Sequence, residues 1–134
     1  MNDQDERIAV IHINMAMYKA YIGKRCFCPD GRWALGSVPF LVRELRMHTE
    51  GIKELNSEAV LRCGYIVETL AERYLGALDP RTLEEVHYLL ENAARVATFR
   101  FPKGKWRTPS EAKIMQDASN TISRSVKKLA QPDA

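Results

Sequence analysis

The sequence lacks long apolar runs, a paired set of cysteines and a glycine-rich loop. No apolar run approaches the roughly 18 residues of a membrane-spanning helix. The polar and acidic residues 1–6 do not have the basic-then-apolar pattern of a secretory signal. Three cysteines are an odd number, which argues against a disulfide framework. These absences predict a cytosolic protein whose cysteines are free thiols.

The composition is that of an ordinary globular domain. The chain has 134 residues, of which 46% are hydrophobic, 28% charged and 8% aromatic. Seven glycines and six prolines are too few for a collagen-like or low-complexity chain. At this length, folding buries roughly two thirds of the unfolded surface, so no metal or disulfide is needed for stability. We therefore expect one domain over residues 1–134.

Apolar residues recur at spacings of three and four in five segments, which is the pattern of helices with one buried face. The first helix is expected to begin at Ile8 and to end at Gly23. Its β-branched start, residues 8–13, leaves a strand open as an alternative. The expected buried positions are Ile8, Ile11, Met15, Tyr18, Ile22, Val38, Leu41, Leu45, His48, Ile52, Leu55, Val60, Cys63, Val67, Leu70, Tyr74, Leu83, Val86, Leu90, Ala93, Ala97, Met115, Ala118, Ile122, Val126 and Leu129.

The later helix starts are marked by residues that can accept hydrogen bonds from first-turn amides. Pro80 and Pro109 fit the first helical position, where no amide donor is needed. Glu111 can complete a capping box with Thr108, and Gly76 is expected to end the third helix. Helices would hold about 70% of the chain, so the predicted fold class is all-α, a compact bundle of about five helices. The expected caps are Ser37, Asn56 or Ser57, Asp79 and Thr108.

Positive charge gathers in two short segments, although the net charge of the chain is only +3. The first segment lies within residues 19–37 and holds one acid, Asp30; the second lies within residues 95–110 and holds none. Both segments interrupt the helical pattern. Their basic residues are Lys19, Lys24, Arg25 and Arg32 in the first, and Arg95, Arg100, Lys103, Lys105 and Arg107 in the second.

The two basic segments share the pattern Pro-x-Gly-[Arg/Lys]-Trp at an offset of 73 residues. Proline followed by glycine favours a tight turn between short extended arms, so we expect basic hairpins at 24–33 and 99–107. A duplication relating 19–55 to 92–128 is one explanation. The other explanation is that the same turn pattern occurs twice by chance, because the remaining positions of the two segments align poorly.

The second basic segment interleaves aromatic and basic side chains. On an extended arm, Phe99 and Phe101 would point to one face and Arg100 to the other. Such a ribbon could lie on a phosphate backbone or on an acidic protein surface. It could equally be a solvated edge whose charges prevent strand pairing. The candidate partner-binding residues are Arg25, Arg32, Trp33, Arg100, Lys103, Lys105, Trp106 and Arg107.

Neither a catalytic nor a metal site is expected. The pair Cys26-x-Cys28 would send its sulfurs to opposite faces of an extended arm, which does not suit zinc. The helical pair Glu84-x-x-His87 has no second copy, as a di-iron bundle would need. The histidines are too scattered to indicate a nucleophile and base. We therefore predict no enzymatic activity and no cofactor.

The sequence favours a small non-enzymatic regulatory protein of a bacterial or phage type, an inhibitor or adaptor that binds a protein partner through a helical face. Because small helical domains often complete their core across a twofold axis, we also expect a homodimer. The alternative function is nucleic-acid binding, including DNA, by the two basic hairpins. A steep salt dependence of binding would distinguish the alternative from an apolar protein interface.

Overall fold

The computed structural model describes residues 3–27, 30, 32–33, 35–50, 57–74, 76, 78–98 and 109–130. This part of the chain is predominantly helical, which confirms the all-α prediction. Within it, no helix is long and apolar enough to cross a membrane. The elements are α1 (Asp3–Cys26), the 3₁₀ helix η1 (Leu35–Ser37), α2 (Val38–Glu50), α3 (Ser57–Arg73), α4 (Pro80–Thr98) and α5 (Pro109–Ala130).

Two proline-initiated helices begin where the sequence predicts. Pro80 is the first residue of α4, and the Asp79 carboxylate accepts a hydrogen bond from the Thr82 amide at 2.7 Å. Asp79 is therefore the N-cap of α4, and this hydrogen bond lowers the pKa of its carboxyl group. Pro109 is the first residue of α5, whereas the predicted cap Thr108 lies outside the described residues.

The predicted end of the first helix is wrong. The helix α1 begins at Asp3, includes residues 8–13 and continues through Gly23 to Cys26. Gly23 does not have the positive φ of a helix-terminating glycine. At the end of α1, the carbonyl of Cys26 accepts a hydrogen bond from the Ser37 hydroxyl at 3.2 Å. Ser37, which the sequence predicts as a cap for the second helix, thus also satisfies the last carbonyl of α1.

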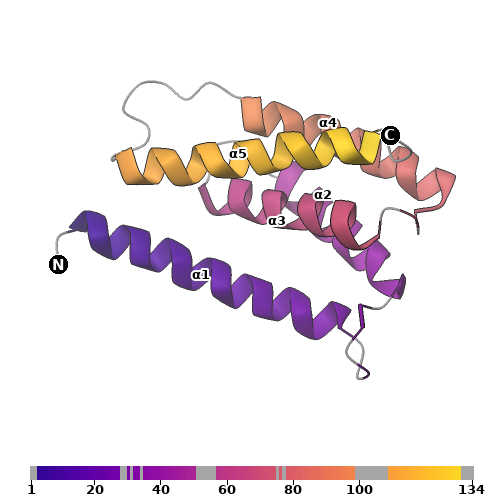
Figure 1. The fold of residues 1–134 in the computed structure, drawn as a ribbon, viewed down its shortest axis with the longest axis horizontal. Coiled ribbons are helices and arrows are strands. Elements are labelled where there is room, and N and C mark those ends of the chain that lie inside the picture. The colour runs from indigo at the N-terminus through magenta and orange to yellow at the C-terminus, as the bar shows by residue number, and fades with distance from the viewer. Residues whose placement is uncertain are drawn as a thin grey trace.

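The helix α3 lies at the centre of the structure, packing against α1, α2, α4 and α5. Figure 1 shows α1 along one edge of the molecule, with α5 and α4 beyond α3 on the other side. Because α1 lies at the edge, most of its circumference is not covered by the other helices. This position determines which surfaces of α1 are free to bind.

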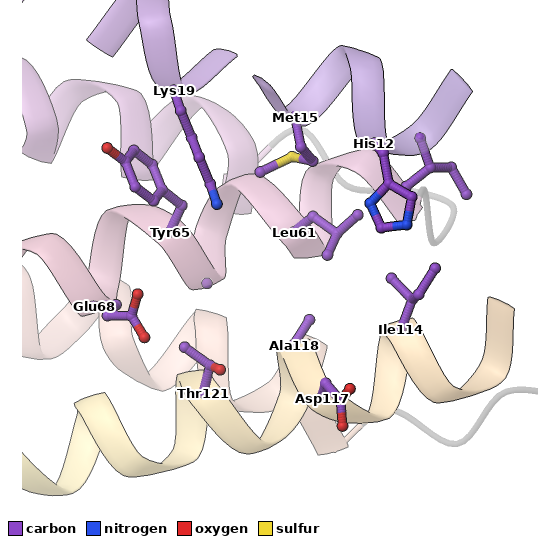
Figure 2. Close-up of a pocket in the computed structure, with 12 residues that line it drawn as sticks. His12, Met15, Lys19, Leu61, Tyr65, Glu68, Ile114, Asp117, Ala118 and Thr121 are labelled. Carbon is purple, nitrogen blue, oxygen red and sulfur yellow. The ribbon is translucent and has the colours of Figure 1, made fainter. Parts of the chain in front are cut away.

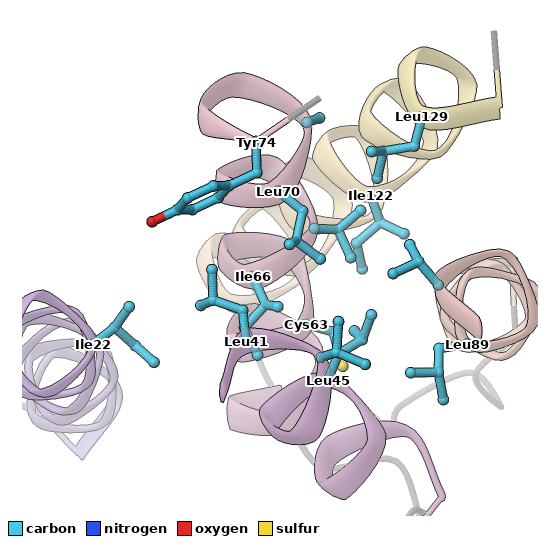
Figure 3. Close-up of a cluster of buried hydrophobic side chains, with 14 of the residues drawn as sticks. Ile22, Leu41, Leu45, Cys63, Ile66, Leu70, Tyr74, Leu89, Ile122 and Leu129 are labelled. Atoms are coloured by element: carbon cyan, nitrogen blue, oxygen red, sulfur yellow. The ribbon is translucent and has the colours of Figure 1, made fainter. Parts of the chain in front are cut away.

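The core joins buried apolar side chains from all five helices. In Figure 3, Ile22 of α1 enters the core from one side and Leu89 of α4 from the other, around Ile66 of α3. These three side chains are fully buried. The predicted stripe of α3 is confirmed at every position, whereas Ile52 and Leu55 lie outside the described residues. The stripe residues that are buried are Ile11, Met15, Tyr18, Ile22, Val38, Leu41, Leu45, Val60, Cys63, Val67, Leu70, Tyr74, Val86, Met115, Ala118, Ile122 and Leu129.

An isolated antiparallel bridge joins Phe27 to Trp33 in the first basic segment. No longer strand extends from it within the described part of the chain. The second predicted hairpin, 99–107, lies outside the described residues. The predicted start of the first hairpin at residue 24 is wrong, because residues 24–26 form the last turn of α1. A hairpin over the rest of the first segment, the second hairpin and the duplication inferred from them remain predictions.

Candidate functional site

Three of the candidate partner-binding residues lie in the described part of the chain, and the structure gathers them at the end of α1. Arg25 is exposed in the last turn of α1, and Arg32 is exposed beyond it. Trp33 is half-buried and packs against the core. The other candidates lie outside the described residues: Arg100, Lys103, Lys105, Trp106 and Arg107.

Not all of this charge is available to a partner. The Arg32 guanidinium donates two hydrogen bonds to Oδ2 of Asp30, at 2.7 and 3.0 Å. The hydrogen bonds from Arg32 lower the pKa of the Asp30 carboxyl. Arg32 therefore forms an exposed ion pair with the only acid of its segment, and Arg25 is the stronger candidate for phosphate or carboxylate contact.

Arginines stack on aromatic rings around this end of α1. The guanidinium of Arg25 lies 5.6 Å from the ring of Tyr21, and that of Arg73 lies 5.6 Å from the ring of Trp33. Trp33 also meets Phe27 edge to face, with ring centroids 5.8 Å apart. At an exposed site such a cation–π contact favours one orientation of the guanidinium group by about 0.5–1 kcal/mol. We call these five residues the Arg–aromatic cluster.

A groove of about 320 Å³ separates α1 from α5, with α3 as its floor. Figure 2 shows Met15 reaching in from α1, Leu61 standing on α3 and Ala118 on α5. Gly64 of α3 also lines the groove, and because it has no side chain, α5 lies close to the α3 backbone there. The inner surface of the groove is therefore apolar.

The rims of the groove carry charges of opposite sign. Lys19 reaches across from α1, and its ammonium nitrogen lies 5.4 Å from the ring centroid of Tyr65 (Figure 2). Glu68 on α3 and Asp117 on α5 line the opposite side. Burial raises the pKa of the Tyr65 hydroxyl, so Tyr65 is neutral at physiological pH. The groove thus combines an apolar inner surface with one cationic and one anionic rim.

A buried polar cluster joins α1, α2 and α3 on the other side of α1. The Tyr18 hydroxyl donates a hydrogen bond to Glu44 Oε1 at 3.0 Å. The Arg62 guanidinium lies 4.6 Å from the centroid of the same ring, and the His48 ring meets it edge-on at 5.7 Å. His48 Nε2 and Arg62 Nε are buried and have no hydrogen-bond partner among the described residues.

This environment holds the cluster in fixed protonation states. Burial, reinforced by Glu44, raises the pKa of Tyr18 far above its usual value. Burial and the neighbouring Arg62 charge lower the pKa of His48, against the opposing effect of Glu44. Tyr18 is therefore a permanent hydrogen-bond donor and His48 is neutral at pH 7. The cluster thus links α1 to α2 and α3.

A second, exposed face of α1 is also apolar, and at its C-terminal end Tyr21 meets Phe40 of α2, with ring centroids 5.9 Å apart. Val10, Ile13, Met17 and Tyr21 are all exposed, with Met17 at 66% of its full accessible surface. Their spacings of three and four place them on one face of the helix. We call these four residues the outer stripe. Large exposed apolar surfaces of this kind mark interaction sites on soluble proteins.

Neither the outer stripe nor the groove was predicted from the sequence. The signal for the stripe was present, because residues 8–22 contain only three polar side chains, His12, Asn14 and Lys19. A helix that is apolar on nearly all sides is normally buried on all sides. The groove had no local signal, since it is formed by three helices that are distant in sequence.

Within the described ranges, no three His, Cys, Asp or Glu side chains come together as metal ligands. Cys26 and Cys63 are buried free thiols, and burial raises the pKa of Cys63 to about 12. No protein-family model, no curated protein and no solved structure matches this chain. Function is therefore inferred from the surfaces of the chain itself.

Proposed function

We propose that this chain is a small non-enzymatic regulatory protein that binds another protein, taking an amphipathic helix of that partner into the groove between α1 and α5. The observation that carries the proposal is the combination of an apolar inner surface, from Met15 to Ala118, with oppositely charged rims at Lys19 and Asp117. Grooves of this kind receive the apolar face of a helix, which anchors through side chains three and four residues apart.

The chemistry of the rims defines the partner. A helix lying in the groove would place apolar anchors over Leu61 and Ala118. Acidic side chains of the partner would suit the Lys19 rim, and basic ones would suit Asp117 and Glu68. The apolar anchors supply most of the binding free energy, and the two rims fix the direction of the bound helix.

The experiment is affinity capture from nuclease-treated host lysate with a groove-blocking variant and a matched control. Thr121 is half-buried and lines the groove, so Thr121→Arg places a long charged side chain in the binding site. Ser123 is exposed on the same helix and does not line the groove, so Ser123→Arg adds the same charge elsewhere.

We expect wild type and Ser123→Arg to capture the same protein and Thr121→Arg to fail to capture it. Capture should change little between about 50 and about 300 mM salt, because the interface is mainly apolar. Equal capture by Thr121→Arg would contradict the groove as the site. Disappearance of the captured protein on nuclease treatment would contradict protein binding and favour the second candidate.

The second candidate function is nucleic-acid binding, and the Arg–aromatic cluster favours it. Arg25 is exposed and oriented on Tyr21, while Phe27 is exposed by about half and available to a base. Arginine and aromatic side chains together bind single strands, through phosphate contact and base stacking. The predicted second basic segment, 99–107, would add charge to such a surface.

Fluorescence anisotropy with a labelled single-stranded oligonucleotide tests this candidate. Arg25→Ala should weaken binding and lower the salt slope by about one unit for each phosphate that is no longer neutralised. Phe27→Ala should remove about 1–3 kcal/mol of stacking. Arg124→Ala, an exposed arginine on α5, is the control and should change neither quantity. Failure of wild type to bind at low salt would exclude the candidate.

A further inference from the structure

We infer that the outer stripe of α1 is a self-association surface, on which a second copy of this chain packs its own α1 antiparallel to the first. The surface is independent of the groove. On a helix of about 100° per residue the outer stripe spans about 80°, and its centre lies about 140° from that of the buried face. His12 and Lys19, which line the groove, lie on the opposite side of α1.

The two ends of the outer stripe carry opposite charges. Glu6 precedes the stripe and Lys24 follows it, and both are exposed. The two residues are eighteen positions apart, which is five full turns, so both lie in line with the centre of the stripe. An antiparallel second helix places its Lys24 opposite Glu6 and its Glu6 opposite Lys24. A parallel helix would oppose like charges at both ends.

The apolar residues obey the same symmetry. Glu6 and Lys24 are equidistant from the level of residue 15, and so are Ile13 and Met17. A twofold axis at that level therefore opposes Ile13 to Met17 of the second copy. These two side chains are both more than half exposed in the single chain, and pairing would cover them.

The two flanks of the stripe are also complementary in size. On one flank, Val10 would pack against Tyr21 of the second copy, so this side of the interface is filled by larger apolar side chains. On the other flank, Ala9 comes beside Ala20 of the second copy, and both alanines are exposed. Small residues on one flank allow two helices to approach closely. Antiparallel packing also sets the two helix dipoles in opposition, which is favourable.

Sedimentation equilibrium with paired variants tests the inference. Wild type at micromolar concentration should have twice the chain mass of 15.3 kDa. Met17→Glu places a charge at the centre of the interface and should raise the dimer dissociation constant about 100-fold or more. Tyr88→Glu is the matched control, since Tyr88 is similarly exposed but lies on α4. It should leave the dissociation constant unchanged.

Charge exchange tests the register. Glu6→Lys and Lys24→Glu should each raise the dissociation constant about 10-fold, because each creates two like-charged contacts. The double variant should return to within about twofold of wild type. Circular dichroism confirms that every variant is folded.

Three outcomes of the association measurements would overturn the inference. They are a wild type that stays monomeric, a dimer insensitive to Met17→Glu, and a double variant that is not rescued. A further outcome would also overturn it: the wild type is monomeric and captures a protein from lysate, and Met17→Glu fails to capture that protein. The outer stripe would then bind another protein and not a second copy of this chain. None of these outcomes bears on the groove, since the variants leave its residues intact.

Discussion

The Tyr18 hydroxyl donates a hydrogen bond to Glu44 Oε1 at 3.0 Å, which joins α1 to α2 across 26 positions of the chain. Glu44 is only 6% exposed. A buried carboxylate is stable only if its oxygens are hydrogen-bonded or paired with a cation. Tyr18 therefore stabilises the charge of Glu44 and, by doing so, fixes the edge helix that carries both the groove wall and the outer stripe.

Tyr18→Phe should lower the free energy of unfolding by about 1–3 kcal/mol, because the buried Glu44 carboxylate loses a hydrogen-bond donor. Urea denaturation at pH 7.5 measures the change. Tyr88→Phe is the control, since Tyr88 is 59% exposed and its substitution should cost under about 0.5 kcal/mol. Equal effects of the two variants would mean that the Tyr18–Glu44 bond does not stabilise the fold.

His48 should make the fold less stable in mild acid. Its folded-state pKa lies below the unfolded value near 6.5, so the unfolded chain binds the proton more tightly. Stability is therefore full above about pH 6.5 and falls as the pH drops through the folded pKa. His48→Phe has no ionisable ring and should lose less stability than wild type between pH 7.5 and 5.

Titration of the His48 ring by NMR tests the cause directly. In wild type its pKa should lie below the usual value. Arg62→Met removes the neighbouring positive charge and should raise the pKa, although burial still holds it down. A ring that titrates at its usual pH in both proteins would contradict the buried environment described for His48.

Local signals predicted the helices well. The Asp79-Pro80 pair predicted the start of α4, and the structure confirms it, because an N-cap and a proline act within one turn. The stripe from Val60 to Tyr74 predicted the buried face of α3 at every position. The prediction at Gly23 was wrong because a glycine ends a helix only when its φ becomes positive, and local sequence alone does not determine this.

The candidate sites were less predictable, because they depend on contacts between distant segments. Glu44 looks like a surface acid in a charged helix, but it is buried and accepts a hydrogen bond from Tyr18 of the distant helix α1. Likewise, both faces of α1 are apolar in the sequence. Packing against α3 determines that Met15 is buried and that Met17 stays exposed. Arg25 was predicted to lie in a hairpin, but it lies in the last turn of α1, because the helix continues through Gly23.

The buried thiols should be unreactive in the folded protein. The pKa of Cys63 is about 12, so its reactive thiolate is scarce at pH 8, and Cys26 is also buried with a raised pKa. The test uses a Cys28→Ser variant, so that only Cys26 and Cys63 can react. Ellman's reagent should label neither thiol of the folded variant in the time that it needs to label both in urea. Rapid labelling of the folded variant would show that the region between α1 and α3 opens readily.

Glycine-to-alanine substitutions test the path of α1. Gly23 lies inside the helix, and a Cβ added there would meet no atom within 4 Å, so Gly23→Ala should stabilise the fold by about 0.5–1 kcal/mol. Gly64→Ala in α3 should stabilise at least as much, because its Cβ would lie 3.7 Å from Ala118 O and Ile122 Cγ1, an ordinary packing distance. Thermal and urea unfolding measure both. If Gly23→Ala were destabilising while Gly64→Ala was stabilising, α1 would end at Gly23 in a left-handed conformation, and the last turn carrying Arg25 would be placed wrongly.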